Sequence, residues 1–553
     1  MALGLWRRAW LPVHRRVHEL DRGLRTIDRP SILGNDTIYA LSSGSGRAGI
    51  AVVRVSGPGC LDVYRGLCPT KAPPKPRYAG VRTLFEPGPA HASDADIVDS
   101  DSLILYFPGP KTVTGEDVLE LHVHGGSATV KAVLSAIAKC SSPAKIRYAE
   151  PGEFTRRAFL NGRLDLAQVE SLGDTLAAET EQQRRAAVRG NSGVLGQTYE
   201  GWREQLLLAR GEIEALIDFS EDQHFDESPA ELLTNVKALV DGILHSIQLH
   251  KLGSQRSELL RNGIRIALLG PPNVGKSSLM NQIVGREASI VSSEAGTTRD
   301  IVEASLDIQG YLCSFADTAG IRTKASELVS NPDGALTSTI GAIEEEGIRR
   351  ARQKALNSDV VIVLASVEPT ESGGHQISYD VETLQLAASA RQCLVAVNKS
   401  DVVSSETLKL LIQDFKASAL AGLGLGDIEP LPISCKAAAS PLSAGLTDPG
   451  GVHTLTGKLA QSFSALTSLP GDMQHLLGVT ERQNQLLSEA EKHLEDFMAE
   501  TRACSPNDEP DVVLAAEHLR LAAAQLASIT GRGESGDVEE VLGVIFEKFC
   551  VGK

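Results

Sequence analysis

The sequence has few aromatic residues, no long apolar run and no excess of positive charge. Phe, Trp and Tyr make up 4% of its 553 residues, which predicts a core of Leu, Ala, Val and Ile with much helix. Because no run of about 18 apolar residues occurs, no membrane span is expected. The net charge of −16 argues against a large basic face for nucleic acid, although it leaves local RNA contact open.

The eight cysteines are scattered. They form neither a Cys-x-x-Cys pair nor a cluster with histidine at zinc spacing. This usage is typical of a reducing, cytosol-like compartment. A zinc-binding module of the Cys-x-x-Cys type is therefore not expected.

The first 34 residues differ in composition from the rest of the chain. They contain seven arginines against three acidic residues, and Leu3, Leu5, Trp6 and Trp10 supply an apolar side. Arginine-rich, acid-poor amphipathic leaders are typical of mitochondrial transit peptides. We therefore predict a transit peptide at residues 1–34, with a disordered basic tail as the alternative.

Hydrophobic periodicity divides the remaining chain into an α/β multidomain protein. Residues 35–160 are mixed α/β, and residues 161–260 are helical, with an apolar stripe at Leu206, Leu207, Ile213, Leu216 and Ile217. Residues 262–463 alternate short strands with helices, which predicts a parallel sheet. Residues 464–553 return to helix. The simplest architecture is a helical domain interrupted by an inserted α/β domain.

The expected elements can be stated by residue. Strands are predicted at 36–41, 50–55, 103–107, 118–123, 264–269, 311–316, 360–364, 394–397 and 431–433, and helices at 129–139, 514–529 and 538–549.

A glycine-rich loop follows the strand predicted at 264–269. Residues 270–277, GPPNVGKS, fit the pattern GxxxxGK[ST] between a strand and a helix that begins near Lys276. In such a loop the backbone N–H groups surround phosphates, and the helix N-terminus adds positive potential. We expect Lys276 to contact the β- and γ-phosphates and Ser277 to bind Mg²⁺.

Three more segments follow in the order that a guanine site requires. Residues 317–320, DTAG, come after a predicted strand, and Asp317 is expected near Mg²⁺ with the N–H of Gly320 at the γ-phosphate. Residues 398–401, NKSD, end another strand, and the carboxylate of Asp401 can accept from N1 and N2 of guanine. Residues 434–436, SCK, can supply a backbone N–H to the guanine oxygen. The predicted nucleotide contacts are Asn273, Val274, Gly275, Lys276, Ser277, Ser278, Thr297, Thr298, Asp317, Thr318, Ala319, Gly320, Asn398, Lys399, Asp401, Ser434, Cys435 and Lys436.

Two catalytic features are less direct. Residues 296–300, GTTRD, are a candidate first switch, with Thr298 as a further Mg²⁺ ligand. After DTAG the residue is Ile321, where Ras-like enzymes have the water-positioning glutamine. The polar group must then come from elsewhere, and Glu344, Glu345 and Glu346 are candidates, unless they are only solvated charges at a helix start.

With these motifs, the chain resembles the MnmE (TrmE) family of tRNA-modifying GTPases over residues 35–553. The specific segments are GRAGIAVVRVSG at 46–57, TGEDVLELHVHGG at 114–126, PGEFTRRAFLNGRLDLAQVESL at 151–172 and the terminal FCVGK at 549–553. The resemblance implies a folate-binding N-terminal domain, a helical domain split by a Ras-like P-loop G domain, and dimerisation through the N-terminal domains. It also implies a partner of the MnmG (GidA) type that contains FAD, tRNA as substrate, and the mitochondrial matrix as location.

The resemblance also assigns residues. Arg54, Glu120, Arg163 and Lys553 fall where the family holds a tetrahydrofolate derivative, 5-formyl or 5,10-methylene; Arg163 is in a place where lysine is common. Asn273, Ser292, Glu294 and Thr297 match the family's K⁺ site, and Glu344 matches its water-orienting glutamate. The longer stretch at 324–342 leaves the choice among the three glutamates open. The implied catalytic residues are Lys276, Glu344 and Cys550.

The implied reaction adds a carboxymethylaminomethyl-type group to C5 of the wobble uridine, with glycine or taurine as the open choice of amine. A GTP-switched ribosome-assembly factor of the Era or Der type is the alternative, but it would need a KH domain or a second G domain. Neither is visible in the sequence, and it would not explain the terminal Cys-x-Gly-Lys.

Overall fold

The computed structural model describes residues 35–88, 94–218, 229–290, 305–315, 357–371, 373–440, 448–502 and 511–532. The chain divides into two compact units, Met1–Leu164 with Glu539–Lys553, and Asp165–Val538. The predicted leader at 1–34 and the predicted helix at 538–549 lie outside the described residues.

The N-terminal unit contains a six-stranded sheet of order β3-β4-β5-β2-β1-β6. Neighbouring strands are antiparallel except for β1 and β6, which are parallel. Its described elements are β1 (Thr37–Leu41), β2 (Ile50–Ser56), α2 (Cys60–Leu67), β3 (Gly80–Phe85), η1 (Asp94–Asp96), β4 (Ile97–Phe107), β5 (Val118–His124), α3 (Ser127–Ala138), β6 (Ile146–Tyr148) and α4 (Glu153–Leu160).

The alternation of side chains along β2 and β5 gives this sheet two different faces. Val53 and Val55 are fully buried, and with Leu119 and Leu121 of β5 they pack against α2 and α3 in one apolar core. The residues between them, including Arg54 and Glu120, therefore point to the opposite face. There a small cluster that includes Phe154 of α4 covers part of the sheet.

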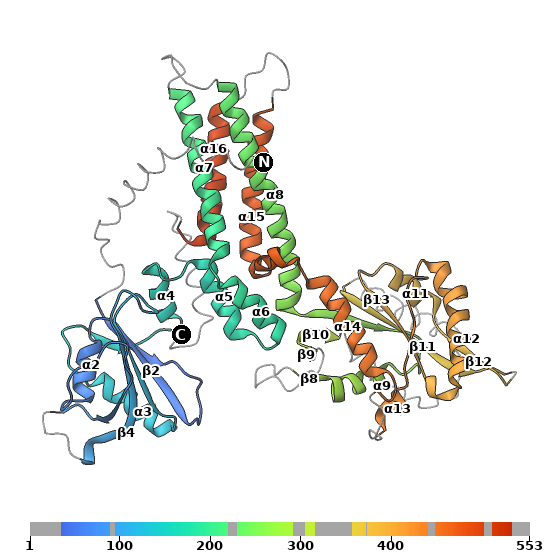
Figure 1. Ribbon diagram of the computed structural model, residues 1–553, viewed down its shortest axis with the longest axis horizontal. Coiled ribbons are helices and arrows are strands. Elements are labelled where there is room, and N and C mark those ends of the chain that lie inside the picture. The colour runs from blue at the N-terminus through green and yellow to red at the C-terminus, as the bar shows by residue number, and fades with distance from the viewer. Residues whose placement is uncertain are drawn as a thin grey trace, which may run out of the picture. The chain divides into compact units, whose positions relative to one another are not determined.

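The helical part of the second unit is a bundle in which four long helices lie alongside one another (Figure 1). Two of them precede the inserted domain and two follow it, so the bundle is interrupted in sequence but continuous in space, as predicted. The described helices of this part are α5 (Leu166–Ala177), α6 (Glu181–Gly190), α7 (Val194–Asp218), α8 (Pro229–Asn262), η7 (Gly471–Gly478), α15 (Glu481–Glu500) and α16 (Val512–Thr530), the long four being α7, α8, α15 and α16.

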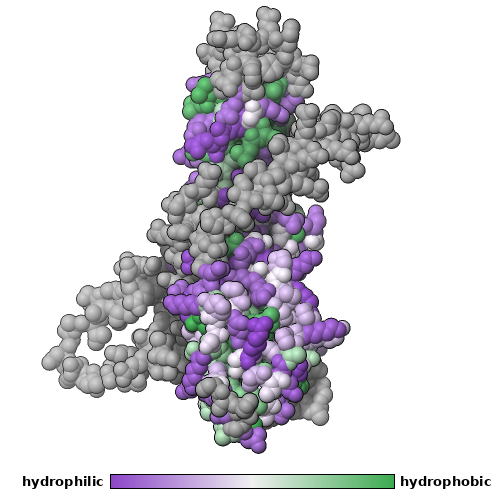
Figure 2. Space-filling model, turned by 90° about the vertical axis from the view of Figure 1, so that its left-hand side faces the viewer, coloured by the Kyte–Doolittle hydropathy of each residue, from purple (hydrophilic) through white to green (hydrophobic). Residues whose placement is uncertain are grey.

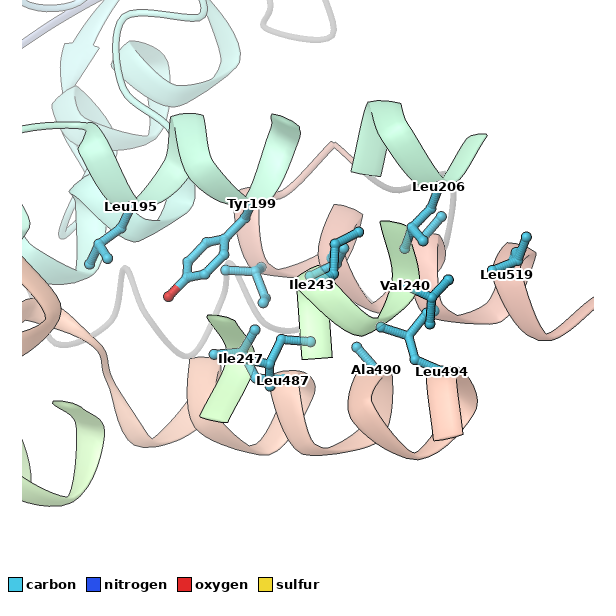
Figure 3. Packing of buried hydrophobic residues seen from close by; sticks show 14 of the residues in the cluster. Leu195, Tyr199, Leu206, Val240, Ile243, Ile247, Leu487, Ala490, Leu494 and Leu519 are labelled. Carbon is cyan, nitrogen blue, oxygen red and sulfur yellow. The ribbon is translucent and has the colours of Figure 1, made fainter. Parts of the chain in front are cut away.

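Aliphatic side chains from all four long helices meet in the bundle core (Figure 3). Leu206 and Ile213 of α7 are fully buried there, which confirms two members of the predicted stripe. The prediction for Leu207 is wrong, because it is 38% exposed: a neighbour of Leu206 is rotated about 100° around the helix and so leaves the core face. The side chains of Leu216 and Ile217 lie outside those that the structure describes.

In the described part of the chain one helix, α16, is long and apolar enough to cross a membrane by length and composition. Its buried residues, among them Leu519 and Leu526, belong to the bundle core. An apolar helix in this position is ordinary for a globular bundle.

The inserted domain has an eight-stranded sheet, with seven strands in the order β14-β13-β11-β7-β10-β9-β8 and β12 paired to β11. The central strands β14, β13, β11, β7 and β10 are parallel, as predicted, whereas β8, β9 and β12 pair antiparallel. The strands are β7 (Ile264–Leu269), β8 (Ala288–Ile290), β9 (Ser305–Ile308), β10 (Tyr311–Phe315), β11 (Val360–Pro369), β12 (His375–Ser378), β13 (Cys393–Asn398) and β14 (Leu431–Pro432).

Helices cover both faces of this sheet, and two separate apolar cores result. One contains Leu279 of α9 with Leu455 and Phe463 of α14, and the other contains Leu384 of α11 with Phe415 of α12. The helical elements are α9 (Lys276–Gln282), the π-helical turn η2 (Ile283–Glu287), α11 (Val381–Ala388), η4 (Ser400–Val402), α12 (Ser405–Phe415), η5 (Lys416–Leu420), η6 (Ala421–Leu423), α13 (Cys435–Ala439) and α14 (Val452–Thr467).

The face of the molecule in Figure 2 is mostly hydrophilic. On the face shown in Figure 2, hydrophilic residues predominate outside the grey parts, and hydrophobic residues are interspersed among them.

Candidate functional site

Three of the predicted nucleotide motifs lie at one edge of the parallel sheet. The loop at 270–275 follows β7, residues 398–401 follow β13, and residues 434–436 follow β14. Because parallel strands present their carboxyl ends at the same edge, three segments far apart in sequence come together there. This edge is the ordinary ligand position in an open α/β sheet.

The loop after β7 has a backbone path that only glycine can follow at two positions. Gly270 has φ +146°, and a Cβ there would lie 2.3 Å from the carbonyl oxygen of Leu364. Gly275 has φ +102°, and a Cβ there would lie 2.2 Å from Nδ2 of Asn398. The two glycines let the loop curl tightly enough to direct backbone N–H groups toward an anion.

Lys276 is the first residue of α9, and its side chain lies back over the loop. Its ammonium group donates to the carbonyl oxygens of Gly270 and Pro271, at 2.7 Å each. Ser277 and Ser278 are exposed in the first turn of the same helix. The loop therefore has a positive charge, free hydroxyls and a helix N-terminus in one place, which suits a polyphosphate with Mg²⁺.

Asn398 joins two of the motifs. Its side-chain amide donates to the carbonyl oxygen of Val274 at 2.8 Å, and its side-chain oxygen accepts from the N–H of Cys435 at 3.2 Å. The side chain is almost fully buried. Asn398 therefore connects the phosphate loop to the loop after β14. Both ends of its side-chain amide bond to the protein, so its role is to position these two loops.

Within the described part of the chain, the side chain of Asp401 accepts one hydrogen bond. Ser434 Oγ donates to Oδ1 of Asp401 at 2.5 Å, and Ser434 Oγ itself accepts from the N–H of Ala437. Asp401 is otherwise exposed, so its carboxylate keeps acceptor capacity for N1 and N2 of a guanine. Adenine offers no matching pair of donors, so this arrangement suits guanine better than adenine.

The structure narrows the choice of backbone N–H group that could donate a hydrogen bond to the guanine oxygen. The N–H of Ser434 donates to Gly450, and that of Cys435 donates to Asn398. The N–H of Lys436 lies in the first turn of α13, where backbone donors have no partner within the helix. Burial raises the pKa of the Cys435 thiol to about 11, so this cysteine is a neutral packing group.

Lys399 has a positive φ of 61° and turns its side chain toward β11. Its ammonium lies 2.5 Å from Oε1 of Glu368, which also accepts from Ser366 Oγ. The hydrogen bonds from Lys399 and Ser366 hold the pKa of Glu368 below its ordinary value. Glu368 was not predictable from the sequence, because its contact with Lys399 depends on the pairing of β11 with β13.

The remaining predicted residues of the G domain lie outside the described part of the chain. They are Ser292, Glu294, Thr297, Thr298, Asp317, Thr318, Ala319, Gly320 and Glu344. Of the predicted Mg²⁺ ligands the structure therefore places Ser277, and of the predicted K⁺ ligands it places Asn273, which is exposed in the loop with φ 61°.

In the N-terminal unit, Arg54 and Glu120 are register partners on β2 and β5. Nε and Nη2 of Arg54 donate to Oε1 of Glu120 at 3.0 and 2.8 Å, and the guanidinium lies 6.0 Å from the ring centre of Phe154. The buried Nε2 of His122 lies 3.5 Å from Oε2 of Glu120 and has no hydrogen-bond partner among the described residues. An orphaned donor or acceptor beside a half-buried carboxylate fits a polar heterocycle such as a pterin.

Arg163 lies three residues after the end of α4, within the segment 151–172. Its Nε donates to the carbonyl oxygen of Thr112 at 2.9 Å, and Asn161 donates to the carbonyl oxygen of Thr114 at 2.7 Å. These two bonds attach the loop at 112–117 to the end of α4. The other two residues predicted for this site, Lys553 and Cys550, lie outside the described residues.

A buried charge network supports the same loop, and the sequence did not reveal it. Arg157 is fully buried and donates to Asp36, Glu116 and Glu153, while Arg147 donates to Asp36 and Glu153. Glu153 and Arg157 are four residues apart on α4, which was the available signal. The network links β1, β6, α4 and the loop that contains Glu116.

The network also sets the charge state of its acids. Burial alone raises the pKa of Glu153, but hydrogen bonds from Arg147 and Arg157 more than offset it and hold the pKa below its ordinary value. The pKa of Asp36 is lowered by the same arginines against the opposing effect of burial. Both groups therefore contribute stability that is present above pH of about 4 and is lost as the pH falls through their depressed pKa values.

The fold and the site define a P-loop GTPase, with the phosphate loop, Asn398 and Asp401 at one sheet edge. Comparison with known families adds the flanking domains. A model of the GTP-binding protein TrmE N-terminus matches residues 37–163, and a model of the MnmE helical domain matches residues 166–550.

Individual relatives match almost the whole chain. The mitochondrial 5-taurinomethyluridine-tRNA synthase subunit GTPB3 of Danio rerio is 37% identical over 528 residues, which cover 94% of each chain. The tRNA modification GTPase MnmE of Parvibaculum lavamentivorans is 38% identical, over 94% of this chain and 100% of the relative. The mitochondrial tRNA modification GTPase MSS1 of Saccharomyces cerevisiae is 35% identical, over 95% of this chain and 94% of the relative. The chain belongs to the TrmE/MnmE family of tRNA modification GTPases.

Proposed function

We propose that this protein is the GTP-hydrolysing component of a complex that adds a carboxymethylaminomethyl-type group to C5 of the wobble uridine in mitochondrial tRNAs, with a folate one-carbon unit. The observation that supports this most strongly is the guanine site formed by the phosphate loop, Asn398 and Asp401, within a chain whose flanks both match the family. Two relatives are named mitochondrial, which supports a mitochondrial location, and we propose the matrix.

For the nucleotide, we assign Lys276 to the β- and γ-phosphates and Ser277, Thr298 and Asp317 to Mg²⁺, which neutralises phosphate charge. Asn273, Ser292, Glu294 and Thr297 would hold K⁺, which supplies positive charge to the transferring phosphoryl group. Glu344 would orient the attacking water, because Ile321 cannot. We assign the remaining nucleotide contacts to the other residues that the sequence motifs predict.

For folate, we assign the pterin edge to Glu120 and the glutamate tail to Arg54, Arg163 and Lys553. The orphaned Nε2 of His122 beside Glu120 supports the polar end of this assignment. Bound as the 5-formyl or 5,10-methylene derivative, tetrahydrofolate supplies the one-carbon unit. Arg54 then has two tasks, since it also orients Glu120.

We propose domain limits of 1–34 for the transit peptide, 35–160 for the folate domain, 161–260 and 464–553 for the helical domain, and 262–463 for the G domain.

The expected partners are tRNA, an FAD protein of the MnmG (GidA) type, and a second copy of the chain through the N-terminal domains. Cross-linking of the purified chain with and without such a partner would test the assembly; a monomer under all conditions would remove the dimer from the proposal.

The function is tested by mass spectrometry of mitochondrial tRNA nucleosides from a strain that lacks the protein. We expect loss of the C5 side chain at the wobble uridine, and the mass of the lost group will show whether glycine or taurine supplies the amine. Unchanged nucleosides would overturn the proposal.

In the same strain, Cys550→Ser should keep GTP hydrolysis but abolish the modification if the thiol takes part in the uridine chemistry. Full modification by this variant would show that the thiol does not take part.

A further inference from the structure

Two neighbouring helices of the bundle each place a histidine at their interface. His493 is in α15, His518 is in α16, and their ring centres are 6.3 Å apart. Asp496 lies three residues after His493, on the same face of α15. One ligand atom from each of the three side chains lies within 4.8 Å of the other two.

We propose that His493, Asp496 and His518 bind one divalent transition-metal ion, with Zn²⁺ as the representative, between α15 and α16. Neutral imidazole and carboxylate are ligands of zinc, cobalt and ferrous iron, whereas Mg²⁺ and Ca²⁺ prefer oxygen donors. Three protein ligands leave a fourth tetrahedral position for water. This site lies apart from the guanine site and does not depend on the proposed function.

The spacing suits a metal centre. In a tetrahedral zinc site with bonds of about 2.0–2.1 Å, neighbouring ligand atoms are roughly 3.3 Å apart. The three ligand atoms lie within 4.8 Å of one another, so they would have to approach by up to about 1.5 Å to reach that geometry.

The hydrogen-bonding state of the two histidines is the second, independent observation. Nδ1 of His493 and Nδ1 of His518 are both buried, and neither has a hydrogen-bond partner among the residues that the structure describes. A buried polar atom without a partner costs about 1–3 kcal/mol, and such atoms are uncommon in native proteins. Both atoms belong to residues of this cluster, so one bound cation would give both of them a partner.

The three ligand residues are partly exposed at the edge of the bundle. Leu494, Phe497 and Leu519, which follow them in the sequence, are fully buried in the bundle core. An apolar layer on one side limits the access of water and strengthens metal–ligand bonds. Because α15 is the first bundle helix after the inserted domain, the ion would connect the two helices of the returning segment.

The test uses the full-length chain after treatment with a chelator, titrated with Zn²⁺ in the presence of excess Mg²⁺. We expect the wild-type chain to bind one Zn²⁺ more than His518→Ala, or to bind that ion at least tenfold more tightly. The matched control is His245→Ala, which removes an exposed histidine of α8 and should bind as the wild type does. Zn²⁺ should raise the Tm of the wild type and of the control but not that of His518→Ala.

A spectroscopic arm identifies the ligands. Co²⁺ in place of Zn²⁺ should give the visible absorption of a tetrahedral site in the wild type, and Asp496→Asn, which keeps the side-chain shape, should reduce it. GTP binding and far-UV circular dichroism report whether each variant is folded. If His518→Ala is not folded, Asp496→Asn takes its place in the Zn²⁺ titration. Equal Zn²⁺ stoichiometry and affinity in wild type, folded His518→Ala and Asp496→Asn would overturn the proposal.

Discussion

We expect guanine selectivity to depend on one carboxylate, that of Asp401. Asp401 is exposed and is held from one side by Ser434. In Asp401→Asn an amide N–H can donate where the carboxylate accepted, so xanthine, which presents a carbonyl at that position, becomes the better partner. We expect GTP affinity to fall about 10- to 100-fold and affinity for xanthosine triphosphate to rise.

Competition binding with a fluorescent guanine nucleotide measures both changes. Asp427→Asn, an exposed aspartate in the same domain, is the matched control and should leave selectivity unchanged. If wild-type protein binds ATP as tightly as GTP, the guanine site is wrongly assigned.

His250 predicts a pH dependence of the helical bundle. Burial, with a smaller effect of His475, lowers its pKa to about 3, and its Nδ1 lies 3.1 Å from the hydroxyl of Tyr199. The unfolded chain takes up a proton near pH 6.5 that the folded chain does not, so stability is full above this pH and falls below it. The loss is at most about 1.4 kcal/mol per pH unit until the folded pKa is reached.

Thermal unfolding of wild type and His250→Gln between pH 7.5 and 5.5 measures this dependence. Glutamine can still hydrogen-bond Tyr199 but does not titrate. The Tm of the wild type should drop more steeply than that of the variant on acidification, and parallel curves would contradict the assignment.

The positions of single residues could be predicted where they belong to a short sequence motif. The phosphate-loop pattern located Lys276 and Ser277 correctly at the start of α9. This was possible because the loop joins β7 and α9, which are adjacent in the sequence. The burial of Arg157 was not predictable, since Asp36 and Glu116 approach it from 121 and 41 residues away. An i,i+4 pair with Glu153 looks the same in sequence whether it is buried or solvated.

Helix contacts in the second unit depend on two glycines. A Cβ on Gly478 of η7 would lie 2.4 Å from Cα of Gly190 in α6, a contact between two backbones that side-chain rotation cannot relieve. Gly478→Ala should therefore lower the free energy of unfolding by about 1–3 kcal/mol. The control is Gly201→Ala in α7, where nothing lies within 4 Å, and it should stabilise the chain by up to about 1 kcal/mol.

Differential scanning calorimetry of the two variants checks the sign of each effect. The Tm of Gly478→Ala should fall and that of Gly201→Ala should stay equal or rise. A Gly478→Ala variant as stable as the wild type would mean that η7 and α6 do not approach so closely.

Elements with a regular apolar pattern were predicted well. The strand predicted at 264–269 is β7 to the residue, and the helix predicted at 514–529 is α16 within two residues at each end. β11 extends beyond the predicted 360–364 to Pro369, because pairing with β12 continues the strand past its apolar core. β12 has only four residues and no clear pattern, so tertiary pairing alone defines it.

For the whole enzyme we predict that hydrolysis depends on K⁺. The motivation is Asn273, exposed in the phosphate loop, together with Ile321 in place of a water-positioning glutamine. Steady-state GTP hydrolysis in matched KCl and NaCl buffers should differ by roughly tenfold or more, since a bound cation stabilises charge that develops in the transition state. Asn273→Ala should remove most of that difference, and equal rates in both salts for the wild type would exclude the cation from the mechanism.

The central claim is that the guanine site powers the modification of tRNA. It is tested by nucleoside mass spectrometry of mitochondrial tRNA from a strain that lacks the protein and is complemented with wild type or Lys276→Ala. Removal of the lysine that we assign to the phosphates should abolish GTP hydrolysis without disturbing the bundle or the N-terminal unit. We predict a modified wobble uridine with the wild type and an unmodified one with Lys276→Ala at equal protein abundance. Full modification in the Lys276→Ala strain would contradict the account.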